Sequence, residues 1–173
     1  MFFRKNGIRN KNVRKLYDYL ATEFNIDDLE YQKSYVLSKF NPMVREFNDI
    51  DWMYFEANIH LWDSETLMHL ALVITEISRK KLNSKIVSKV YCLAFIHCSY
   101  DDVDVLFEDL YHTLPLMADV EEEILRKVIV RLDELQTIEA FAKHYTEAQT
   151  IEKTKDFILQ KLQLTIEVNS RNN

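Results

Sequence analysis

The sequence predicts an all-α protein in which antiparallel helical hairpins stack side by side. Three observations support this prediction. The 173 residues include one glycine, Gly7, and two prolines, Pro42 and Pro115, whereas tight β-hairpin turns and strand-to-helix crossings depend on glycine. Residues 90–96 are continuously apolar, and a helix that is apolar all round has to be covered all round. Residues that cap helix starts also recur at a nearly constant spacing from residue 64 onward.

Length and charge bound the domain organisation. A chain of 173 residues with 47 % hydrophobic residues forms one domain, or at most two small ones, with a substantial core. We expect a flexible basic arm at residues 1–10, a single helical domain at residues 11–168 and a disordered tail at residues 169–173. The net charge is −6, but residues 1–15 carry +6 and the remainder therefore −12. The six cations of residues 1–15 are Arg4, Lys5, Arg9, Lys11, Arg14 and Lys15.

The amino-terminal part predicts three helices of unequal length. Asn10 or Asn12 caps the first, which continues to residue 25 with apolar residues at helical spacing. The second starts near Asp27 and ends at residue 40. Asn41 and Pro42 then form the N-cap and first position of a short third helix over residues 43–47.

Aromatic residues concentrate in residues 50–62. Trp52, Phe55, Ile59 and Trp62 follow one another at helical spacing and form a single stripe. Such a stripe can stack on bases or bind a peptide. We interpret it as core, because large aromatic side chains more often fill the interior of a protein.

From residue 64 the capping residues form a regular series. Helix starts are predicted at Ser64, Ser84, Asp101, Asp119 and Thr137, in steps of 20, 17, 18 and 18 residues. Two steps make about 37 residues, the period of helical-hairpin repeats. The last helices are expected at residues 137–145 and 150–168. The pattern resembles HEAT-like or armadillo-like α-solenoid architecture over residues 50–168, without a recurring residue signature that names a family. An irregular closed bundle of seven to nine helices remains the alternative.

The helix expected over residues 84–98 is the centre of this arrangement. It is too short to cross a bilayer, so it is read as the buried middle of the array. Cys92 and Cys98 lie six positions apart on it, beyond disulfide reach, and are read as buried small hydrophobic residues. The chain shows neither a secretory h-region nor an apolar run of 18 residues. We therefore expect a cytoplasmic protein with no membrane partner.

The scarcity of glycine also limits the chemistry. Phosphate-binding loops and nucleophile elbows require glycines that this chain lacks, so we expect no enzyme activity and no cofactor. Three Glu-His pairs occur at i, i+4, a spacing that can hold a metal or form an acid–base pair. They involve Glu56 with His60, Glu65 with His69, and Glu108 with His112. The metal candidates are therefore Glu56, His60, Glu65, His69 and His112, although three such pairs arise readily in a helical chain with 28 acids and five histidines.

One charge pattern is unusual. Residues 101–123 contain nine acidic residues and no lysine or arginine. First-turn positions explain part of this placement, but not the absence of cations one turn away. We assign eight of these acids, all except Asp119, to a partner-binding surface, which we call the acidic edge. The acidic edge comprises Asp101, Asp102, Asp104, Glu108, Asp109, Glu121, Glu122 and Glu123.

These observations give three functional hypotheses. The first is a non-catalytic interaction protein whose acidic edge binds a basic protein, for example as an inhibitor or immunity-type neutraliser. The second is nucleic-acid or phosphate-surface binding by the basic residues of positions 4–15. The third is a helical metal-binding enzyme. Neither the partner's identity nor the oligomeric state follows from the sequence.

Overall fold

The computed structural model describes residues 7–24, 33–74, 84–100, 120–139 and 145–171, together with residues 103, 106, 107, 110 and 141. These residues form helices and connecting turns, with no strand among them, so the predicted all-α class is confirmed. The elements are α1 (Lys11–Thr22), α3 (Lys33–Arg45), α4 (Asp49–Asn58), the 3-10 helix η2 (Ile59–Leu61), α5 (Ser64–Ile74), α6 (Ser84–His97), α8 (Glu122–Gln136) and α10 (Tyr145–Arg171).

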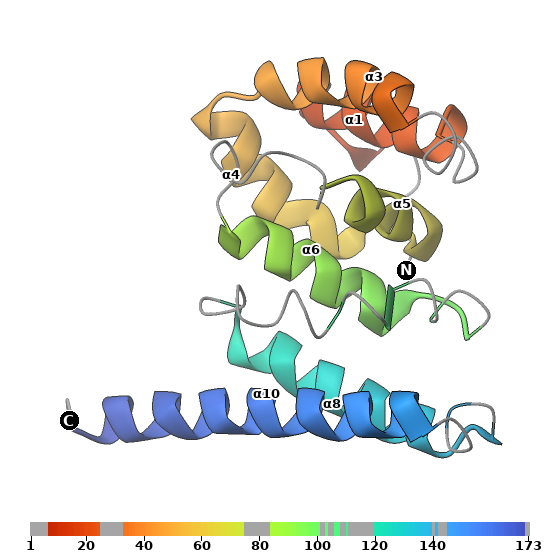
Figure 1. Cartoon of the computed structure of the whole chain (residues 1–173). Helices are drawn as coiled ribbons and strands as arrows, with labels where there is room; N and C mark the ends of the chain where they lie inside the picture. The colour runs from red at the N-terminus through yellow and green to blue at the C-terminus, as the bar shows by residue number, and fades with distance from the viewer. Residues whose placement is uncertain are drawn as a thin grey trace.

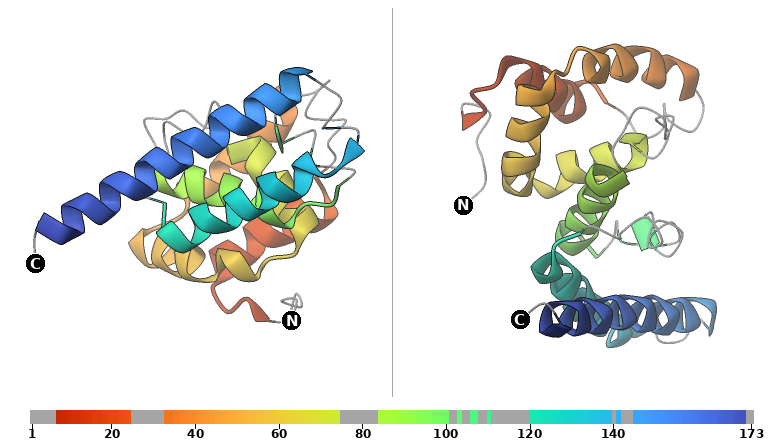
Figure 2. Two further views of the ribbon diagram at one scale, coloured as in Figure 1. Left: turned by 90° about the horizontal axis from the view of Figure 1, so that it is seen from below. Right: turned by 90° about the vertical axis from the view of Figure 1, so that its left-hand side faces the viewer.

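The helices form a stack (Figure 1). Helices α1 and α3 make one end, α8 and α10 make the other, and α6 crosses the middle. The main helix contacts join α1 to α3, α4 and α5, then α5 to α6, α6 to α8, and α8 to α10. The carboxyl-terminal part of α10 projects beyond its neighbours in Figure 1 and in the left view of Figure 2. Within the described residues, no helix is both long and apolar enough to traverse a bilayer.

Helix α6 is covered on opposite sides, as its sequence requires. Every side chain from Val90 to Phe95 is buried, and the hydroxyl-bearing Ser88 is buried with them. Helix α5 contacts α6 on one side and α8 contacts it on the other. No disulfide joins Cys92 and Cys98, both of which are buried. The predicted burial of this apolar run is confirmed for residues 90–95.

The aromatic stripe of residues 50–62 belongs to the core. Phe55, Ile59 and Trp62 are buried, and Trp52 packs against them while partly exposed. The rings of Phe55 and Trp62 meet edge to face with centroids 5.6 Å apart, and Tyr17 of α1 contacts Trp62 in the same way at 5.1 Å. The stripe therefore holds α1 against the segment that leads from α4 into α5.

Helix α3 differs from its prediction. The expected break at Asn41-Pro42 does not occur, and α3 continues through both residues to Arg45. Proline has no N–H to donate to the Ser38 carbonyl and its ring crowds that group. The loss is confined to the last turn, because the helix ends three residues later. The helix starts expected at Asp27, Asp101 and Asp119 lie outside the described residues.

Helix α10 is longer than predicted. It begins at Tyr145 rather than Thr150 and continues to Arg171, so residues 169–171, expected in a disordered tail, are helical. Its buried residues Ile151, Ile158 and Leu162 continue the core cluster that begins at Ile8. The short helix expected over residues 137–145 lies partly outside the described residues.

Asp51 connects the starts of α1 and α4. Its buried carboxylate accepts hydrogen bonds from Asn10 Nδ2 at 2.7 Å, Asn12 Nδ2 at 2.9 Å and the Asn48 backbone N–H at 3.0 Å. Asn10 and Asn48 are the N-caps of α1 and α4. These hydrogen bonds favour the charged carboxylate, so the pKa of Asp51 is lowered. One side chain thereby fixes two helix starts against each other.

Replacing Asp51 with alanine should lower the free energy of unfolding by about 2–3 kcal/mol, because hydrogen bonds to a charged acceptor are lost at two helix ends. Denaturant unfolding followed by circular dichroism measures the change. Asp49→Ala, an exposed acid in the same first turn, is the matched control and should cost less than about 1 kcal/mol. Equal losses in the two variants would contradict the proposed role of Asp51.

Candidate functional site

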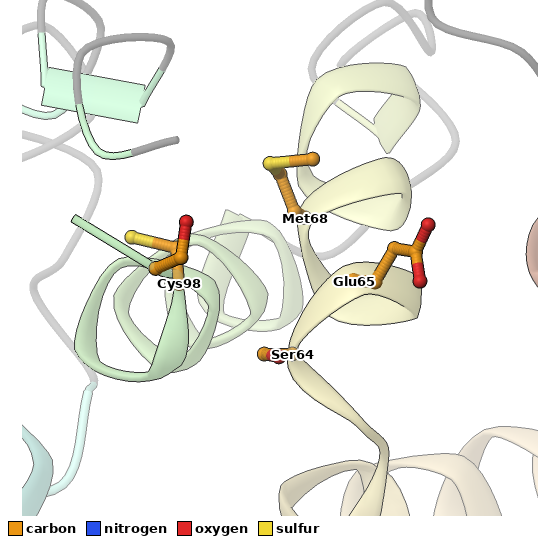
Figure 3. A pocket seen from close by; sticks show the side chains of 5 residues that line it. Ser64, Glu65, Met68 and Cys98 are labelled. Atoms are coloured by element: carbon orange, nitrogen blue, oxygen red, sulfur yellow. The ribbon is translucent and has the colours of Figure 1, made fainter. Parts of the chain in front are cut away.

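A pocket of about 220 Å³ lies between the start of α5 and the end of α6 (Figure 3). Ser64, Glu65 and Met68 line it from α5, and Cys98 and Ser99 line it from the end of α6. Figure 3 shows that the Glu65 carboxylate points away from Cys98, and that the Cys98 thiol points away from α5. The acidic edge begins two residues after Ser99 in the sequence.

Asp63 fixes the α5 wall of the pocket. Its side chain accepts hydrogen bonds from the Thr66 N–H and hydroxyl, both at 2.9 Å, and its carbonyl accepts from the Leu67 N–H at 3.0 Å. Asp63, rather than the predicted Ser64, is thus the N-cap of α5. The Tyr17 hydroxyl of α1 donates to the same carboxylate at 2.7 Å, so the pocket wall is tied to the first helix.

The Tyr17 and Asp63 pKa values move apart. Burial is the largest cause that raises the pKa of Tyr17, followed by its hydrogen bond to Asp63, and together they raise it to about 12. For Asp63 burial acts upward, but hydrogen bonds from Thr66 and Tyr17 outweigh it and lower the pKa. At neutral pH a neutral phenol therefore donates to an ionised carboxylate.

Arg131 fixes the α6 wall. This α8 residue is buried and donates from a guanidinium nitrogen to the Cys98 carbonyl at 2.8 Å. A second guanidinium nitrogen donates to Glu134 at 3.2 Å, and the Tyr100 ring lies 4.1 Å from the guanidinium carbon. A cation is favourable at this position, because the carbonyls at a helix end carry partial negative charge. Sequence analysis missed both Arg131 and Asp63; the signal for Arg131 is a cation within the apolar face of α8, between Val128 and Leu132.

The pocket lining does not assemble a catalytic pair. The Cys98 thiol donates to the Phe95 carbonyl at 3.3 Å rather than to a base. The second cysteine, Cys92, is fully buried, and burial raises its pKa to about 12, opposite to the shift that activates a thiol nucleophile. In this pocket Ser64, Ser99 and the exposed Glu65 can form hydrogen bonds with a ligand.

The Glu-His pairs do not assemble a metal site in the described part of the chain. His69 Nδ1 lies 2.9 Å from the Leu20 carbonyl and its ring packs on Phe24, whereas its expected partner Glu65 is exposed at the pocket. His60 lies in η2, because α4 ends at Asn58, so the α-helical spacing assumed for Glu56 and His60 does not apply. His112 and Glu108 lie outside the described residues. Residues that the structure describes contain no group of three or more potential metal ligands.

Three members of the acidic edge are described, and each has a cation. Glu121 pairs with Lys89 of α6 at 2.8 Å, Glu122 with Arg126 at 2.6 Å, and Glu123 with Lys127 at 2.7 Å. The hydrogen bond from Lys127 lowers the pKa of Glu123. Pairs such as these reduce the field that Glu121, Glu122 and Glu123 contribute. Asp101, Asp102, Asp104, Glu108 and Asp109 lie outside the described residues.

Part of the predicted basic arm is packed on the domain. Ile8 is buried, and its carbonyl accepts hydrogen bonds from the Arg14 guanidinium, 2.7 Å from Nε. The Lys15 ammonium pairs with Glu46 at 3.0 Å. Two of the six cations of residues 1–15 thus have partners within the protein, while Arg9 and Lys11 have exposed positions. Arg4 and Lys5 lie outside the described residues.

Comparisons of this chain with protein-family models, with curated proteins and with solved structures return no match.

The free energy of unfolding at alkaline pH should depend on Tyr17. Its folded pKa of about 12 exceeds the ordinary value of 10.0, so its contribution is complete below pH 10 and is lost as the pH rises toward about 12. Tyr17→Phe should lower the free energy of unfolding by about 1–2 kcal/mol at neutral pH. The difference in free energy of unfolding between the wild-type protein and the Tyr17→Phe variant should disappear as the pH rises toward about 12. Denaturant unfolding at a series of pH values tests this, and a constant difference would contradict it.

Replacing Arg131 with methionine should lower the free energy of unfolding by about 2–4 kcal/mol, because the buried carbonyl of Cys98 and the end of α6 lose their donor. The matched control is Arg126→Met, on the exposed side of the same helix, which should cost less than about 0.5 kcal/mol. Denaturant unfolding measures both. If both variants unfold alike, Arg131 does not hold the α6 wall.

Proposed function

We propose that this protein is a non-catalytic interaction module whose acidic edge binds a basic protein partner. The observation that carries the proposal is the charge pattern of the first half of the edge. None of Asp101, Asp102, Asp104, Glu108 and Asp109 has a lysine or arginine three or four positions away in the sequence. The usual cations that neutralise acids on a helix are therefore missing from this half.

The three described residues of the acidic edge differ from the other five, because each of them has a cation as partner. Glu122 and Glu123 have their cations one helical turn away, in Arg126 and Lys127, and Glu121 has Lys89. The protein thus supplies cations to residues 121–123, and the sequence supplies none near residues 101–109. A concentrated negative field raises the rate at which a positively charged partner is captured.

The pocket between α5 and α6 supports an interaction function over catalysis. Its lining offers hydroxyl groups and a carboxylate, with Glu65 and Cys98 pointing in different directions. The described residues contain no group of three or more potential metal ligands. Two of its lining residues, Cys98 and Ser99, directly precede the acidic edge in the sequence.

The proposal includes an open, HEAT-like row of helices as the scaffold. From α5 onward the main contacts join successive helices, whereas α1 contacts α3, α4 and α5, and α10 lies at the opposite end of the stack from α1 (Figure 1). A row of this kind presents a long side to a partner. A closed bundle is the alternative architecture.

Within this class, we favour the neutralisation of a basic effector protein in the cytoplasm. A small acidic helical protein can cover the cationic surface that such an effector uses to reach nucleic acid. The alternative of nucleic-acid binding through residues 4–15 has weaker support, because Arg14 and Lys15 already have partners within the protein.

The test is a pull-down with a charge-reversed variant in which Asp101, Asp102 and Asp104 are changed to lysine. The wild-type protein should capture basic proteins from a cell extract at low salt, identified by mass, and the variant should lose them. Capture should also weaken as salt is raised, because a charged interface is screened.

A second triple variant controls for net charge. Glu23, Glu46 and Asp156 are exposed acids directly after α1, after α3 and on α10; changing them to lysine alters the total charge equally and should leave capture intact. If both variants lost the same partners, the loss would be explained by net charge and not by the position of the acidic edge. Undiminished capture by the first variant would rule out the acidic edge.

A further inference from the structure

One face of α4 exposes apolar side chains to solvent. Ile50 is 73 % exposed and Met53 is 72 % exposed. Ala57, which follows Met53 by four positions, is exposed as well, so the three residues form a stripe along one side of the helix. The opposite side is buried through Asp51 and Phe55. Single exposed apolar residues are common on protein surfaces, but this stripe groups three along one helix.

The amino-terminal segment enters the domain beside this stripe. The Arg9 backbone N–H donates to the Tyr54 hydroxyl at 2.9 Å. Tyr54 follows Ile50 by four positions and precedes Ala57 by three, so it borders the stripe on the helix surface. The buried side chain of Ile8 and the hydrogen bonds to its carbonyl hold the chain at this position. Residues before Ile8 therefore start from the edge of the exposed face.

We propose that residues 1–6 lie across α4 and that Phe2 and Phe3 cover Ile50 and Met53. Phe3 lies five positions before the anchored Ile8, and an extended chain of that length spans about 17 Å. Helix α4 has 10 residues and is about 15 Å long. Every part of the stripe is therefore within reach. Two phenylalanine rings gain by leaving water, and a methionine sulfur makes favourable contacts with aromatic rings.

Charge complementarity supports the same occupant. Asp49 and Glu56 lie on α4, one turn before and one turn after Met53, and so flank the apolar stripe. Arg4 and Lys5 follow directly after the two phenylalanines. A segment with this sequence matches both the apolar stripe and the acids beside it. The first cations of the basic arm then serve attachment to α4 rather than phosphate binding, and this inference stands independently of the proposed function.

The test is the rate at which hydrogen peroxide oxidises Met53, measured by peptide mass spectrometry. In the wild-type protein Met53 should react slowly, and in the Phe2→Ala/Phe3→Ala variant it should react several-fold faster. Met68, which is 8 % exposed, reports in the same sample that the core is intact. Leu159→Ala removes an exposed apolar side chain from α10 and should leave the Met53 rate at the wild-type value.

Protein concentration separates the segment from other occupants. Protection by residues of the same chain should be the same in dilute and concentrated samples. Protection that appears only at high concentration would assign the stripe to a second copy and overturn the proposal. Equal rates in the wild-type protein and the double variant would also overturn it, and would leave the stripe for a different partner.

Discussion

The fold depends on covering α6 from two sides. Because its side chains from Val90 to Phe95 are all buried, this helix cannot lie at a surface, and elements from both ends of the chain have to meet it. Helix α5 supplies one cover and α8 the other. Each cover then has its own second face to bury, which α1 and α10 provide. The order of the stack therefore follows from the apolarity of its central helix.

The near absence of glycine shapes how the helices end. Many helices finish with a glycine in the left-handed conformation, which satisfies the last carbonyls locally. No residue in the described part of the chain has a positive φ. At the end of α6 the carbonyl of Cys98 is instead satisfied by Arg131 from another helix. The carboxylates of Asp51 and Asp63 likewise accept backbone N–H groups at the start of α4 and α5 and also accept a hydrogen bond from α1, donated by Asn12 and Tyr17 respectively. Helix termini in this protein are thus also the points at which neighbouring helices are joined.

Local features of the fold were predictable from the sequence, and distant ones were not. The cap at Asn10 and the start at Ser84 follow from residue type and from the apolar spacing after them. The passage of α3 through Pro42 depends on how little helix remains after it. The pairing of Glu121 with Lys89 spans 32 residues, so no local pattern indicates it. For the same reason, the sequence located the acids at positions 121–123 but did not indicate that Lys89 of α6 pairs with Glu121.

Helix capping does not by itself explain the absence of cations near the acids of residues 101–109. Like charges one helical turn apart destabilise a helix by a few tenths of a kcal/mol per pair, and their separation is shorter than the screening length of about 8 Å at physiological ionic strength. Salt therefore does not remove the repulsion. Leu106 is buried and is therefore an unfavourable position for a lysine, but polar positions such as Thr113 could carry a cation and do not. If the acidic edge binds a basic protein, as proposed, the cations of that partner would offset this repulsion on association.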